Sequence, residues 1–129
     1  MGDKNGCKYE CRNGKKPKPK EFHIPSSNGC GSFGYKLDMQ YLPAVEGCCD
    51  KHDKCYDTCN KMKESCDDDF RSCLRRICKR NSNVLKEAND ACKSFADGMY
   101  AGVMALGCKP YRDSQKQACD CGDSGKIDL

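Results

Sequence analysis

The sequence predicts a mainly α-helical, disulfide-rich domain with an antiparallel two-helix hairpin at its centre. Three observations lead to this fold class. Cysteine occurs 14 times in 129 residues, a share typical of disulfide scaffolds. Hydrophobic residues make up only 37% of the chain and Trp is absent, so a large core is hard to build. In two neighbouring segments, cysteines and apolar residues recur at helical spacing.

The even number of cysteines allows seven disulfides, each of which typically stabilises a domain by about 2–4 kcal/mol. Because disulfides form in oxidising compartments, we expect a secreted protein, seen here as a mature chain without its signal peptide. The alternative is a thiolate zinc site. Close pairs such as Cys7/Cys11 and Cys55/Cys59 lack the CxxC spacing of such sites, and the chain has only two His residues.

The formal net charge of +4 is mild and comes from 23 basic and 19 acidic residues. It permits attraction to an anionic membrane surface or lipid aggregate. Nucleic acid is not expected as a partner, because the basic residues are not interleaved with aromatic ones. We expect the protein to be a monomer.

Residues 1–28 are predicted to form an irregular arm, and residues 29–129 the globular domain. Pro17, Pro19 and Pro25 argue against a helix or a central strand in the arm. A run of lysines accompanies these prolines, at positions Lys15, Lys16, Lys18 and Lys20. Two interpretations of this run stay open: a solvated extended segment, or a contact with lipid headgroups.

The domain begins with a Gly-rich stretch at 29–43, some of whose apolar residues alternate as in a strand. Helices are predicted at about 44–60, 63–80 and 83–106, the last of them amphipathic. Pro43 suits the start of the first helix. The tail from Gly107 is polar and is predicted to be turn-like, pinned by its cysteines.

The first two helices each carry two cysteines seven residues apart, Cys48 with Cys55 and Cys66 with Cys73. If the helices pack antiparallel through a tight turn near Lys61, Cys55 lies opposite Cys66 and Cys48 lies opposite Cys73. Two disulfides would then clamp one hairpin.

The same register places His52 opposite positions 67–70, where Asp67 is the acidic candidate to orient the imidazole. Tyr56 lies one turn after His52, so its hydroxyl can reach the same carboxylate. Asp53 is turned by about 100° from His52 and points elsewhere. With backbone carbonyls of the Gly-rich loop, its carboxylate would make an oxygen-rich site that suits calcium. Taken singly, each residue also has a structural interpretation: His52 in packing, Asp67 in a first helical turn, Asp53 in solvent.

Three segments together resemble secreted phospholipase A2. The run CCDKHDKCY resembles that family's active-site signature, NGCGSFG its calcium loop, and CDDDFRSC the helix that supplies a second catalytic aspartate. The short link between the helices and the ending GCKPYRDSQKQACDC resemble the group XII branch. The resemblance covers roughly residues 28–121.

The resemblance implies a calcium-dependent hydrolase that cleaves the sn-2 ester of glycerophospholipids at a membrane interface. His52 would be the general base, with Asp67 orienting it and Tyr56 supporting Asp67. The implied calcium ligands are the Asp53 carboxylate and the backbone carbonyls of Gly29, Gly31 and Phe33. The family pattern also pairs Cys30 with Cys49.

The sequence departs from the family pattern in several places, one of which is the missing β-hairpin between the family's two long helices. Phe33 stands where a glycine is usual, the link from the loop to Cys48 is longer, and the family's amino-terminal helix has no counterpart before Cys30. The altered loop favours one alternative, a weakly active or non-catalytic lipid- or receptor-binding scaffold. A cysteine-rich toxin or growth-factor-like module would explain the cysteines but not the His52–Asp53 pair. The remaining disulfides stay unassigned, those of Cys7, Cys11, Cys59, Cys78, Cys92, Cys108, Cys119 and Cys121.

Overall fold

A computed structural model describes residues 6–27, 29–30, 42–80 and 86–122. Within these ranges the chain is mainly helical, as predicted, with two short strands. The elements are β1 (Lys18–Pro19), α2 (Leu42–Tyr56), α3 (Lys63–Arg80), α4 (Lys86–Leu106), α5 (Cys108–Ala118) and β2 (Cys119–Asp120).

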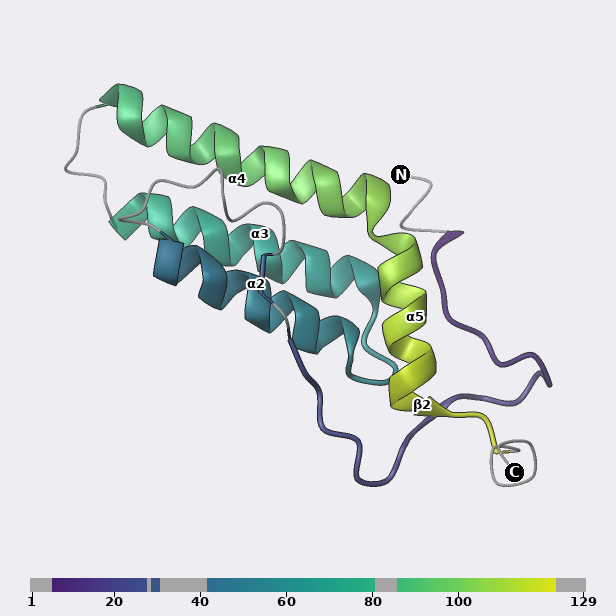
Figure 1. The fold of residues 1–129 in the computed structure, drawn as a ribbon. Coiled ribbons are helices and arrows are strands. Elements are labelled where there is room, and N and C mark those ends of the chain that lie inside the picture. The colour runs from purple at the N-terminus through teal and green to yellow at the C-terminus, as the bar shows by residue number, and fades with distance from the viewer. Residues whose placement is uncertain (1–5, 28, 31–41, 81–85, 123–129) are drawn as a thin grey trace.

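Helices α2, α3 and α4 lie side by side with α3 in the middle, and α5 crosses one end of this layer (Figure 1). Helix α3 has the predicted bounds of 63–80, whereas α2 begins at Leu42 and ends four residues before the predicted Asn60. The start of the third predicted helix, at 83–85, lies outside the described residues. So does the strand-like pattern at 31–41.

The core between α2, α3 and α4 is small and follows the apolar stripe of each helix. Phe70, Leu74 and Ile77 recur at helical spacing on α3 and are all buried. From α4, Ala96 and Met99 complete the packing, and burying a large apolar side chain contributes about 1.5–3 kcal/mol. These few side chains leave much of the stability to cross-links.

All fourteen cysteines are paired in seven disulfides. Cys48–Cys73 and Cys55–Cys66 clamp the α2–α3 hairpin, which confirms the prediction made from their spacing. The bridge between Cys30 and Cys49, implied by the resemblance, is also present. The pairs that the sequence left open are Cys7–Cys108, Cys11–Cys121, Cys59–Cys119 and Cys78–Cys92.

The prediction of a turn-like tail after Gly107 was wrong, because residues 108–118 form helix α5. Its sequence is mostly polar, and contacts with the rest of the protein stabilise it. The buried Gln115 amide donates to the backbone oxygens of Tyr56, at 2.7 Å, and Thr58, at 2.8 Å. The Cys59–Cys119 disulfide fixes the end of α5 against the same turn. Tertiary contacts therefore stabilise α5 as a helix, although the apolar residues of its sequence give only a weak helical signal.

The amino-terminal arm is irregular over most of its described length and is joined to the end of the chain. Strand β1 pairs antiparallel with β2, with Lys18 opposite Asp120. Two of the disulfides, those of Cys7 and Cys11, tie the arm to α5 and to the residues after β2. Of the described helices, none has the length and apolar character needed to cross a membrane.

Candidate active site

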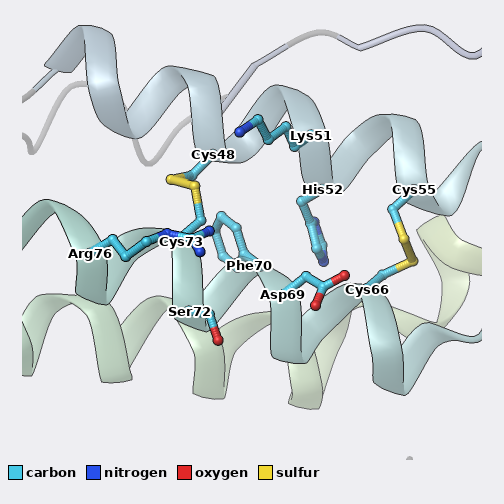
Figure 2. Close-up of a pocket in the computed structure, with 10 residues that line it drawn as sticks. All are labelled: Cys48, Lys51, His52, Cys55, Cys66, Asp69, Phe70, Ser72, Cys73 and Arg76. Carbon is cyan, nitrogen blue, oxygen red and sulfur yellow. A yellow bond between two sulfur atoms is a disulfide. The ribbon is translucent and has the colours of Figure 1, made fainter.

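The site is built around His52, which points from α2 toward α3 between the two hairpin disulfides (Figure 2). Its ring is buried and stacks at an angle against Phe70, with ring centroids 4.6 Å apart. The Tyr56 ring also contacts the imidazole, and the centroids of these two rings are 4.3 Å apart. Because rings and disulfides surround the imidazole, its orientation is fixed before any ligand arrives.

Asp67 is the orienting partner of this imidazole. Its Oδ1 lies 2.7 Å from His52 Nε2, and the same oxygen accepts a 2.7 Å hydrogen bond from the Tyr56 hydroxyl. The residue is only 2% exposed. Burial raises the pKa of Asp67, but hydrogen bonds from His52, Lys63 and Tyr56 and the charge of Lys63 outweigh it, so this pKa lies below its ordinary value.

The protonation of Asp67 determines the tautomer of His52. An ionised carboxylate only accepts hydrogen bonds, so His52 must donate its proton from Nε2. The neutral ring then carries its lone pair on Nδ1, which is the nitrogen able to take a proton. The arrangement can therefore act as a general base with a fixed direction.

Lys63 is a member of this network that the sequence analysis missed. Its ammonium donates to Asp67 Oδ2 at 2.7 Å and to the backbone oxygen of Val103, near the end of α4, at 2.9 Å. The residue is 4% exposed, which is rare for a lysine unless it is paired. A signal was present in the sequence, since Lys63 and Asp67 are opposite charges one helical turn apart. Only the end of α4, however, makes the pair a buried one.

Two hollows lie near the site, and His52 lines the first of them. A groove of about 380 Å³ runs between α2 and α3, bounded by the two hairpin disulfides and flanked by the exposed side chains of Lys51 and Arg76 (Figure 2). Asp53 lies on the opposite side of α2, since residues 51 and 53 are each turned about 100° from residue 52. It lines a second hollow of about 260 Å³ together with Tyr56, Ser26 and Ser27.

The predicted calcium ligands are only partly within the described structure. Asp53 and Gly29 are described, whereas Gly31 and Phe33 lie outside the described residues. Cys49 and Asp53 are one turn apart on α2, so the Cys30–Cys49 disulfide brings the start of the Gly-rich loop to the face that carries Asp53. Gly29 has φ of +80°, in the left-handed region that favours glycine.

The donors in the predicted set, the Asp53 carboxylate and backbone carbonyl oxygens, are of the chemical kind that suits a calcium ion. Across the described ranges there is no group of three or more His, Cys, Asp or Glu side chains placed to hold a metal. The predicted calcium site takes one ligand from a side chain and the others from backbone carbonyls. It is therefore not a cluster of metal-binding side chains.

The clamped helix hairpin, with a buried imidazole–carboxylate pair between its disulfides, is the arrangement expected from the resemblance to secreted phospholipase A2. Comparison with protein families matches residues 1–129 to the family described as group XII secretory phospholipase A2 precursor. The chain therefore belongs to the group XII secretory phospholipase A2 family, and it is a secreted protein.

Curated relatives agree with this family. The chain is 42% identical over 135 residues to human group XIIA secretory phospholipase A2, covering all of this chain and 71% of the relative. It is also 42% identical to the mouse group XIIA protein, over 70% of that protein. Mouse group XIIB secretory phospholipase A2-like protein is 40% identical over 139 residues, again over the whole of this chain and 71% of the relative. No solved structure gives a significant match.

Proposed function

We propose that the protein hydrolyses the sn-2 ester of glycerophospholipids at a membrane interface, with calcium as cofactor, releasing a fatty acid and a lysophospholipid. The observation that carries this proposal is the buried hydrogen bond from His52 Nε2 to Asp67, which leaves Nδ1 as the base. The substrate class comes from the family and from the named activity of the group XIIA relatives.

In the proposed reaction, His52 Nδ1 takes a proton from a water molecule as the water oxygen attacks the ester carbonyl carbon. The ring becomes positively charged, and the ionised Asp67 stabilises that charge through the Nε2 hydrogen bond. His52 then returns the proton to the departing glycerol oxygen. When bound by Asp53 and the loop carbonyls, calcium supplies Lewis-acid stabilisation of the negative charge on the ester oxygen.

The residues behind His52 hold it for this task. Tyr56 and Lys63 bind the two oxygens of Asp67, so the carboxylate cannot rotate away from the ring. Because the pair is shielded from water, each of these interactions is stronger than it would be at the surface. The base therefore needs little rearrangement before it accepts a proton.

A non-catalytic or weakly active scaffold is the second candidate. One specific observation favours it, since a relative at 40% identity carries the name phospholipase A2-like protein. Phe33 at a usual glycine position points the same way, because it changes the loop that would supply carbonyl ligands. The intact set of His52, Asp53 and Asp67 favours the enzyme.

The test is release of fatty acid from mixed phospholipid vesicles and from monomeric short-chain phospholipid, in millimolar calcium and in excess chelator. We expect release only with calcium, and a loss of at least about a hundredfold in His52→Gln and Asp67→Asn. The matched control is Asp90→Asn, an exposed aspartate of α4 that lines neither hollow, and it should keep the activity.

Correctly oxidised protein that releases no fatty acid from either substrate at any calcium level would reject the enzyme in favour of the scaffold. Hydrolysis that persists unchanged in His52→Gln would reject the assigned base. Hydrolysis that persists in chelator would reject the calcium requirement alone.

A further inference from the structure

Two large apolar side chains of the arm project into solvent within three residues of each other. Phe22 is 92% exposed and Ile24 is 81% exposed, and His23 stands between them. The other exposed large apolar residues in the described part of the chain are Met62 and Leu106, at 61% and 77%, and they lie far along the sequence. An aromatic and a β-branched residue so close together make an apolar tip, whereas single exposed residues are ordinary.

The fold holds this tip in place from both sides. His23 Nε2 lies 3.0 Å from Asp57 Oδ1, and the Ser26 backbone N–H donates to Asp57 Oδ2 at 3.0 Å. Before the tip, the Lys20 backbone N–H donates to the oxygen of Ala118 at the end of α5, at 2.9 Å. After β1 the described arm loops out and then returns to α2 (Figure 1).

Phe22 itself adopts a conformation that side chains rarely take. Its φ of +68° lies in the left-handed region, which disfavours residues other than glycine. Such a conformation persists only where neighbouring contacts impose it, and it is found often at functional positions. We therefore attribute the exposed position of Phe22 to the contacts that anchor the arm on either side of it.

The sequence that leads to the tip is basic. Lys15, Lys16, Lys18 and Lys20 are all exposed, and Glu21 is the acidic residue within positions 15–24. Apolar side chains flanked by lysines match the surface of an anionic bilayer, where the chains meet acyl groups and the ammonium groups meet headgroups. A protein partner would need a complementary shape, for which a two-residue tip offers little area.

The tip also lies next to the candidate site. Asp57, which anchors it, directly follows Tyr56, and Ser26 and Ser27 line the hollow that contains Asp53. A bilayer in contact with the tip is therefore adjacent to the Asp53 side of His52. We propose that residues 15–24 are a membrane-docking segment in which Phe22 and Ile24 insert into an anionic phospholipid surface. The choice of lipid rests on the proposed function, but docking is separable from hydrolysis.

The experiment compares the full oxidised chain with Phe22→Ser/Ile24→Ser in co-sedimentation with vesicles of phosphatidylcholine and phosphatidylserine, in excess chelator. We expect vesicle binding to fall by about tenfold or more, because both side chains lose their apolar contact with lipid. Met62→Ser/Leu106→Ser is the matched control, since it also removes two exposed apolar residues, and it should bind as the native chain does. Lys18→Glu/Lys20→Glu should weaken binding to the anionic vesicles and leave binding to pure phosphatidylcholine unchanged.

Equal losses in the two apolar double variants, or no loss in either, would overturn the proposal. So would a self-association of the native chain, seen by analytical ultracentrifugation, that the Phe22→Ser/Ile24→Ser change removes while vesicle binding stays. Hydrolysis of monomeric short-chain phospholipid separates this proposal from the previous one. If hydrolysis is absent but vesicle binding depends on Phe22 and Ile24, docking stands and the enzyme does not.

Discussion

At the scale of single residues, the most unusual feature is a buried charge network in a very small core. Asp67 holds His52 and Tyr56 with one oxygen and Lys63 with the other, and all four side chains are buried. Buried ion pairs do little for net stability but cost much when one partner is removed. The network therefore fixes one geometry for His52 and penalises any other.

The pH dependence of stability follows from Asp67. Its pKa is lowered in the folded protein from an ordinary value of 3.8, so near that pH the unfolded chain binds more protons than the folded one. The stabilisation is thus complete above the ordinary pKa and is lost as the pH falls through the lower, folded value. We expect the advantage in unfolding free energy of the native chain over Asp67→Asn to shrink below about pH 4 in urea titrations. An advantage that stays constant into strong acid would contradict this.

Lys63→Met tests the second oxygen of the carboxylate. The change keeps the volume but removes the ammonium that pairs with Asp67 Oδ2, and leaves the Val103 oxygen with the Gly107 N–H as its donor. We therefore expect a loss of about 3–5 kcal/mol in urea unfolding, most of it from the buried, unpaired carboxylate. We also expect a lower kcat on short-chain phospholipid, because the carboxylate is less firmly held. The double variant Lys63→Met/Asp67→Asn should lose less stability than the two single losses together, since the orphaned charge is gone. Strictly additive losses would show that the two side chains do not act as a pair.

At the scale of elements, the junction of α4 and α5 brings the network together. One residue, Gly107, separates the two helices, and it is buried against the site. A Cβ at this position would collide with the Val103 backbone oxygen and would lie 2.7 Å from the Tyr56 hydroxyl. Glycine therefore allows the chain to turn into α5 while α4 supplies its last carbonyls to Lys63.

Gly107→Ala should therefore be destabilising, by about 1–3 kcal/mol, because backbone must move to admit a methyl group. Gly98→Ala is the matched control. It lies within α4, where an added Cβ meets nothing within 4 Å, and should stabilise by about 0.5–1 kcal/mol through helix propensity. Thermal or urea unfolding of both variants decides the matter; similar effects of the same sign would mean that Gly107 has no special packing role.

Sequence reasoning succeeds for elements whose signal is local. The spacing of four cysteines places α2 against α3 in register, and this register alone brings Asp67 opposite His52. It fails for α5, because a polar helix is stabilised by distant partners such as the carbonyls that Gln115 binds. It fails for Lys63 for the same reason, because helix α4 buries this lysine and the residues around position 63 give no sign of that contact.

At the scale of the whole molecule, the disulfides fall into two sets. Four bridges join residues 11 to 25 positions apart and tie neighbouring elements. Three others span 60 to 110 positions and fasten the arm and the α2–α3 turn to the end of the chain. Within the first set, the sequence predicts the two bridges of the α2–α3 hairpin, because helical spacing places their cysteines opposite each other. It cannot predict those of the second set, because no local pattern links residues so far apart.

The long-range set has a consequence for how the protein is made. A nascent chain enters an oxidising compartment amino end first, so Cys7 and Cys11 arrive roughly a hundred residues ahead of Cys108 and Cys121. The hairpin bridges can close while synthesis continues, whereas the arm must wait as a pair of reactive thiols or in temporary pairings. Correct maturation therefore depends on oxidation of waiting thiols, or on thiol–disulfide exchange from temporary pairings, after the last cysteines emerge. The arm that carries Phe22 and Ile24 takes its final place only at that late step.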